Sequence, residues 1–174
     1  MSGLAQSQDS MLRLIKARPI NTKDSYLKLV EGSTELAAMR EIAIWWRTYH
    51  LERTCIHTGR LMKRLGLFGQ AVAEFYAGTA AAPFAEDTGR QFVAAMSGHG
   101  DPLVASMAQF EAALLKVRAG SAGRYGIEWD RNPNDVFRAL EQGEELPPSE
   151  GLPCYFVEVA GNIPGMVCCT YFVE

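Results

Sequence analysis

The chain has 174 residues, of which 48% are hydrophobic and 21% are charged, and its formal net charge is −3. This composition is typical of a globular protein and excludes a disordered chain or a coiled coil. No run of about 18 apolar residues is present that could span a bilayer, and the polar N-terminus lacks a signal-peptide pattern. We therefore expect a cytoplasmic protein with reduced thiols at Cys55, Cys154, Cys168 and Cys169.

Charge is distributed unevenly along the chain. Residues 1–64 contain eleven Lys and Arg residues against six Asp and Glu, whereas residues 65–174 contain six basic residues against fourteen acidic ones. This asymmetry indicates an oriented partner or two opposed faces. A surface whose charges cluster without a functional reason is the alternative.

The first part of the chain has helical periodicity. The pattern predicts helices over 4–17, ended by Pro19, and over 22–30, ended by Gly32. Residues 35–65 are predicted to form the longest helix, because candidate core residues recur at alternating steps of four and three. This stripe consists of Ile44, Thr48, Leu51, Cys55, Thr58, Met62 and Leu65.

Three further helices are predicted before residue 120. Two of them, over 70–77 and 88–96, flank an irregular stretch rich in Gly, Ala and Pro. The third begins at Asp101-Pro102, where Asp caps free N–H groups and Pro suits the first turn, and it ends at Gly120.

The pattern changes after residue 120. Strands are predicted over 124–129, 154–160 and 166–173, with a helix from Asn132-Pro133 to Gly143 and a hairpin linker at 161–165. The fold class is thus α+β, with a helical domain (1–119) and a small β-α-β-β unit (120–174) that forms an antiparallel sheet. The expected inner face consists of Tyr125, Ile127, Trp129, Tyr155, Val157, Val159, Val167, Cys169 and Tyr171.

No residue is assigned a catalytic or metal-binding role. The histidines His50, His57 and His99 have no recognised ligand spacing, and the thiols lack paired CxxC spacing. Cys55 with His57 is the one candidate for a nucleophilic site, but Cys55 belongs to the apolar stripe, which favours a packed thiol.

The terminal strands suggest peptide binding. A small sheet has two edges with unpaired backbone groups, and an extended peptide can add to such an edge. The expected peptide contacts are Tyr155, Val157, Cys168, Thr170 and Phe172. The alternative is that the helical domain or a second copy of the chain covers the edge.

The segment 40–64 carries six basic residues interleaved with Trp45, Trp46 and Tyr49. A DNA-binding regulator using this segment is the alternative function, although its basic residues lie on different sides of the predicted helix and the chain is acidic overall. We favour a protein-docking surface formed by Trp45, Trp46, Tyr49, Arg53 and Arg60, with deep packing of the aromatic residues as its alternative.

Residues 35–119 resemble a family of helical domains once classed as DNA-binding. The matching positions are Tyr76, Pro83, Gly89, Phe92 and Glu111, whereas Ala112 stands where the family commonly has Trp. Members accompany TIM-barrel, multinuclear non-haem iron enzymes that modify ribosomally made peptides, such as those of methanobactin and 3-thiaglutamate biosynthesis.

The resemblance implies a function for this chain. It would be a non-catalytic accessory subunit, without a cofactor of its own, that forms a heterodimer with the TIM-barrel iron enzyme. The β unit would bind the leader of the precursor peptide and present the peptide to iron held by the partner.

Overall fold

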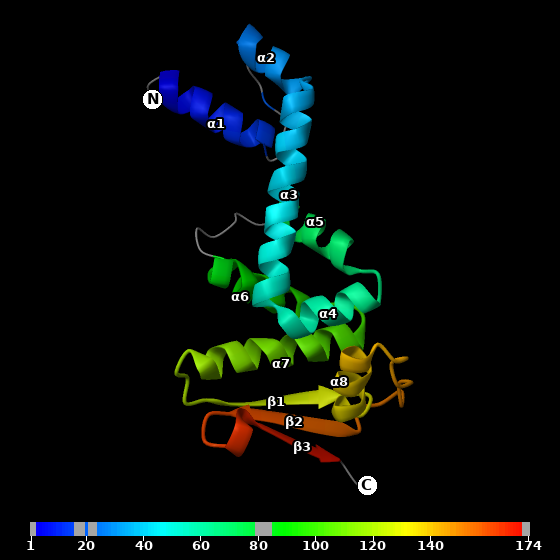
Figure 1. Cartoon of the computed structure of the whole chain (residues 1–174). Coiled ribbons are helices and arrows are strands. Elements are labelled where there is room, and N and C mark those ends of the chain that lie inside the picture. The colour runs from blue at the N-terminus through cyan, green and yellow to red at the C-terminus, as the bar shows by residue number, and fades with distance from the viewer. Residues whose placement is uncertain (1–2, 16–19, 21–23, 79–84, 172–174) are drawn as a thin grey trace. The chain divides into compact units, whose positions relative to one another are not determined.

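The computed structural model describes residues 3–15, 20, 24–78 and 85–171, and Figure 1 shows the whole chain. The fold is α+β, as predicted: helices precede a three-stranded antiparallel sheet. The chain divides into two compact units, Met1–Tyr49 and His50–Glu174. The boundary expected after residue 119 lies inside the second unit and stays a prediction.

The first unit is built from three helical segments. They are α1 (Gly3–Ile15), α2 (Ser25–Glu31) and the first part of α3 (Thr34–Thr54). Leu14, Leu27 and Leu36 form its small core, and Nε of Arg40 donates a hydrogen bond to the carbonyl of Leu14 at 2.8 Å. Pro19, the predicted end of the first helix, lies outside the described residues.

The second unit contains the end of α3 and most of the other elements. Its helices are α4 (Ile56–Arg64), α5 (Phe68–Gly78), α6 (Ala85–Met96), α7 (Pro102–Arg118), α8 (Pro133–Gln142) and the 3₁₀ helix η1 (Pro164–Met166). Its strands are β1 (Arg124–Trp129), β2 (Tyr155–Ala160) and β3 (Val167–Tyr171). The helix starts predicted at Asp101 and Asn132 are confirmed, since both side chains accept hydrogen bonds from the first turn.

Helix α7 is the central element of the second unit. It packs against α4 and α6 and also against β1 and β2, and the buried residues of these elements form one core. Figure 1 shows α7 running beside the sheet, with β3 as the strand farthest from it. Residues 168–171 of β3 are exposed as a consequence.

The prediction of a single helix over 35–65 is wrong. Cys55 (φ −116°, ψ 63°) separates α3 from α4, and its side chain does not cap α4. The carboxylate of Glu111 from α7 takes that role, accepting hydrogen bonds from the N–H groups of His57 and Thr58 at 2.9 Å each. These two N–H groups therefore bond to a side chain from α7 instead of to carbonyls of a continuous helix.

The predicted apolar stripe is correspondingly shorter than expected. Leu51, Cys55, Thr58 and Met62 are buried, but the side chain of Ile44 is exposed. Close packing of α6 against the α3–α4 junction requires Gly89, because a Cβ there would lie 2.6 Å from Oγ1 of Thr54. The resemblance position Gly89 thus has a steric role in this chain.

The Glu111 contact gives the first prediction. Glu111→Gln replaces one carboxylate oxygen by an NH₂ group, which cannot accept from an N–H, so a buried donor is left unpaired. We expect the free energy of unfolding to fall by about 1–3 kcal/mol in urea titrations. Glu74→Gln removes the same charge from an exposed position on α5 and should change stability by less than about 0.5 kcal/mol. Equal stability of the two variants would contradict the capping role.

Candidate functional site

Strand β3 forms an edge of the sheet. The strand order is β1-β2-β3, with Val157 opposite Ile127 on one side and opposite Cys169 on the other. The predicted inner face is confirmed for Ile127, Trp129, Val157 and Val159, all of which are buried. Cys169 and Tyr171 share this face by register but are exposed, because α7 packs mainly against β1 and β2.

Two hydrogen bonds show which way the peptide groups of β1 point. The carbonyl of Trp129 accepts from Cys154 N–H, which immediately precedes β2, at 3.0 Å, whereas the carbonyl of Glu128 accepts from Oγ of Ser106 on α7 at 2.7 Å. Successive residues of an antiparallel strand direct their peptide groups to opposite sides. From this alternation we infer that the peptide groups of Tyr125 and Ile127 face β2 and that those of Gly126 face the outer edge.

The same alternation can be followed to β3. Phe156 and Glu158 direct their peptide groups away from β1, toward their partners Thr170 and Cys168. The peptide groups of Cys169 and Tyr171 then point away from β2, toward the edge. Together with Val167, which has the same alternation, these residues are the main-chain donors and acceptors that β3 would offer to an added strand.

The predicted peptide contacts occupy different places in this arrangement. Tyr155 and Val157 lie on the central strand, where backbone groups are paired on both sides, and the side chain of Val157 is 1% exposed. Cys168 and Thr170 expose side chains on the outer face. Phe172 lies outside the described residues. The sequence did not identify Cys169 and Tyr171 as the residues with outward backbone groups. The pattern of side chains does not show which residues of a strand direct their N–H and carbonyl groups toward the neighbouring strand.

Aromatic side chains lie beside the β3 edge. The rings of Tyr155 and Tyr171 are 4.9 Å apart on the inner face, and Tyr171 is 53% exposed. The hydroxyl of Tyr155 donates to the Glu150 carboxylate at 3.0 Å, which raises the pKa of Tyr155 to about 12. This pair presents two mutually tilted aromatic rings to the side chains of an added strand.

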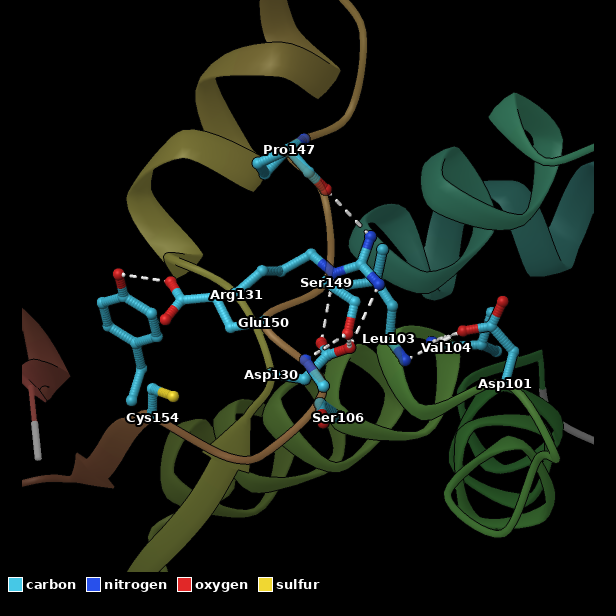
Figure 2. A network of polar contacts seen from close by, with 12 residues as sticks. Asp101, Leu103, Val104, Ser106, Asp130, Arg131, Pro147, Ser149, Glu150 and Cys154 are labelled. Atoms are coloured by element: carbon cyan, nitrogen blue, oxygen red, sulfur yellow. Dashed lines mark hydrogen bonds and ion pairs between the residues drawn. The ribbon is translucent and has the colours of Figure 1, made fainter.

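A polar network holds the loop that leads into β2 (Figure 2). The Asp130 carboxylate accepts from the Arg131 guanidinium and the Ser149 hydroxyl, and Arg131 also donates to the Pro147 carbonyl at 3.0 Å. Burial by itself raises the pKa of Asp130, but the hydrogen bonds from Arg131 and Ser149 outweigh it and lower the pKa. The network fixes Glu150, and with it the Tyr155 side chain.

The predicted docking residues fall in both compact units. Trp45 and Trp46 are 58% and 48% exposed, and both rings lie within 6 Å of the Tyr49 ring. The deep-packing alternative is therefore wrong for the two Trp residues within their own unit. Arg53 and Arg60 belong to the second unit and are exposed.

The basic side chains of Lys63 and Arg64 form contacts within the second unit. Lys63 forms an ion pair with Glu52 at 2.7 Å, and Arg64 donates to the carbonyls of Gly143 and Glu144 at the C-terminal end of α8. The basic residues of 40–64 are thus divided between α3 and α4.

Cys55 and His57 do not form an activated pair. Burial raises the pKa of Cys55 to about 12, so the thiol is protonated at neutral pH, and it donates to the Gly89 carbonyl at 3.4 Å. Burial also lowers the pKa of His57, whose ring packs edge-on against Phe110 and Phe137. Within the described part of the chain, no group of three or more His, Cys, Asp or Glu residues could hold a metal ion.

None of the described helices is both long enough and apolar enough to cross a membrane. Comparison with protein-family models, with curated proteins and with solved structures found no match to this chain. The family resemblance therefore stays a hypothesis.

His57 gives a prediction of pH dependence. Its folded-state pKa lies below the ordinary value of 6.5, so below pH 6.5 the unfolded chain binds the proton more readily and stability falls until the pH passes the folded-state pKa. His57→Phe keeps an aromatic ring and removes the titration. We expect its free energy of unfolding to change less between pH 7 and pH 5 than that of the wild type.

The matched control is His50→Phe, which changes an exposed histidine. The comparison is between the slopes of the free energy of unfolding against pH in the two variants. If His50→Phe flattened the slope as much as His57→Phe, the assignment to His57 would be wrong.

Proposed function

We propose that this chain is a recognition subunit that binds the leader of a ribosomally made precursor peptide by adding it as a strand to β3. The observation that carries the proposal is the β3 edge, which no strand among the described residues pairs and where Cys169 and Tyr171 are inferred to direct peptide groups outward. Segment 167–171 contains no Lys or Pro, the residues that proteins often use to blunt an edge.

Strand addition would combine general affinity with side-chain selectivity. Main-chain hydrogen bonds to Cys169 and Tyr171 bind any extended backbone, and alternate side chains of the ligand meet the two faces of the sheet. On one face lie the rings of Tyr155 and Tyr171, and on the other lie Cys168 and Thr170. We expect a leader with an aromatic or large aliphatic residue at alternate positions.

The class of complex is proposed from the resemblance of residues 35–119. In this proposal the chain is an accessory subunit, and the TIM-barrel partner holds the iron and performs the oxidation of the peptide. The exposed aromatic cluster of Trp45, Trp46 and Tyr49 supports a docking role, because Trp and Tyr often anchor protein interfaces. Arg53 and Arg60 are proposed to contribute to docking as well. A cytoplasmic location belongs to the same proposal.

Cys169→Pro tests strand addition. Proline is tolerated on an edge strand where the N–H faces outward, so the sheet should form while the edge loses a donor and gains a bulky ring. We expect affinity for a precursor peptide encoded beside the gene, measured by fluorescence anisotropy, to fall by about tenfold or more. Cys169→Ala removes the same thiol but keeps the N–H, and it should bind as the wild type does.

Circular dichroism and amide spectra of both variants verify the fold. A folded Cys169→Pro variant with wild-type affinity would exclude β3 as the site of addition.

Docking is tested with the aromatic cluster. Trp46→Ala should reduce the amount of an iron-containing protein that copurifies with the tagged chain, because an anchor residue at an interface contributes about 2 kcal/mol or more. Leu152→Ala removes another exposed apolar side chain, from the loop before β2, and should leave the yield of iron unchanged. Equal iron yields from the wild type and Trp46→Ala would argue against docking through Trp46.

A further inference from the structure

The opposite edge of the sheet borders a groove of about 350 Å³. Its walls include Gln109, Ala112, Ala113 and Lys116 from α7, and residues 124–127 from β1. Side chains of four consecutive strand residues point to both faces of a sheet, so they line one groove together only where it borders the strand's edge. The groove thus lies between α7 and the outer edge of β1.

The α7 wall is smooth and carries a cation at one end. The four α7 residues share one side of the helix by their spacing, and the two Ala residues between them leave room beside the strand. Nζ of Lys116 lies 5.2 Å from the centre of the Tyr125 ring, whose hydroxyl is 2.8 Å from the Ser121 hydroxyl. The lysine is therefore held near the start of β1.

The alternation along β1 makes Gly126 the candidate on this wall for main-chain pairing. By the alternation, Gly126 and Glu128 direct their peptide groups outward. The Glu128 carbonyl already accepts a hydrogen bond from the Ser106 hydroxyl. At Gly126 the Phe156 ring covers the outer face so closely that an added Cβ would lie 2.2 Å from it. The absence of a side chain lets this ring pack there, while the Gly126 N–H and carbonyl face the groove.

The positive charge of Lys116 indicates which kind of ligand would suit the groove. Arg124 is neutralised by its ion pair with Glu158, whereas Lys116 forms no ion pair with a carboxylate of the described residues. At about 3.3 Å per residue, the four β1 residues match a stretch of about four extended residues. A groove of this size suits a short segment and not a folded partner.

We propose that this groove binds an extended peptide segment that carries an acidic side chain. The segment pairs with Gly126 by main-chain hydrogen bonds, and its carboxylate contacts the Lys116 ammonium. This site is independent of the function proposed for β3, since it uses the opposite edge, and either site can exist without the other.

The test uses an acetylated, amidated hexapeptide of alternating Thr and Glu as the probe, and one of alternating Thr and Gln as its uncharged counterpart. Titration of the ¹⁵N-labelled full chain should shift the Gly126 amide and slow its hydrogen exchange. The acidic probe should bind more tightly than the neutral one, and the difference should shrink as salt is raised.

Lys116→Glu should weaken binding of the acidic probe by about tenfold, because attraction becomes repulsion, and should leave the neutral probe little affected. The matched control is Arg118→Glu, the same charge reversal two residues along α7, which should bind the acidic probe nearly as the wild type does. Amide spectra verify that both variants are folded.

Several outcomes would overturn the proposal. One is equal weakening by Lys116→Glu and Arg118→Glu, which would indicate general electrostatic attraction. Another is protection of Cys169 and Tyr171 without Gly126, which would place the probe on β3 and support the proposed function alone. A third is a shift of Gly126 with protein concentration without any probe, which would identify a second copy as the occupant.

Discussion

The carboxylate of Glu111 is the contact on which the arrangement of the second unit depends. It is 4% exposed and accepts the N–H groups of His57 and Thr58, so it supplies the cap that Cys55 does not provide. A buried carboxylate is costly unless its oxygens are hydrogen-bonded, and the first turn of a helix provides donors together with a favourable dipole. The contact therefore holds α4 against α7 and fixes where α3 ends.

The position of α7 in turn determines which parts of the sheet are available. One side of α7 contacts α4 and α6, and another contacts β1 and β2. β3 is the strand farthest from α7, and its residues 168–171 are exposed, whereas Val167 packs against the core (Figure 1). The Ser106 hydroxyl also reaches Glu128, which anchors α7 beside the β1 edge while leaving Gly126 open. The two candidate binding edges thus follow from the placement of one helix.

The two edges differ in their chemistry. The β3 edge is flanked by the Tyr155–Tyr171 pair and by exposed thiols, and burial together with the neighbouring Cys168 raises the pKa of Cys169, so this thiol is protonated at neutral pH. The β1 edge lies in a groove beside Lys116. Under the two proposals, an apolar extended segment would suit the first edge and an acidic one the second.

The amino-acid sequence by itself determined the α+β class, the helix starts at Asp101 and Asn132, and the inner face of β1 and β2, because caps and residue alternation are local signals. The sequence predicted one helix over 35–65, because no residue pattern near Cys55 indicates that a helix ends there. Only the tertiary structure placed Glu111, 54 residues from His57, at that point. The folded sheet likewise decided that Cys169, Tyr171 and Gly126 direct peptide groups outward, because the pairing of strands and not the side-chain pattern sets the phase of the hydrogen bonds.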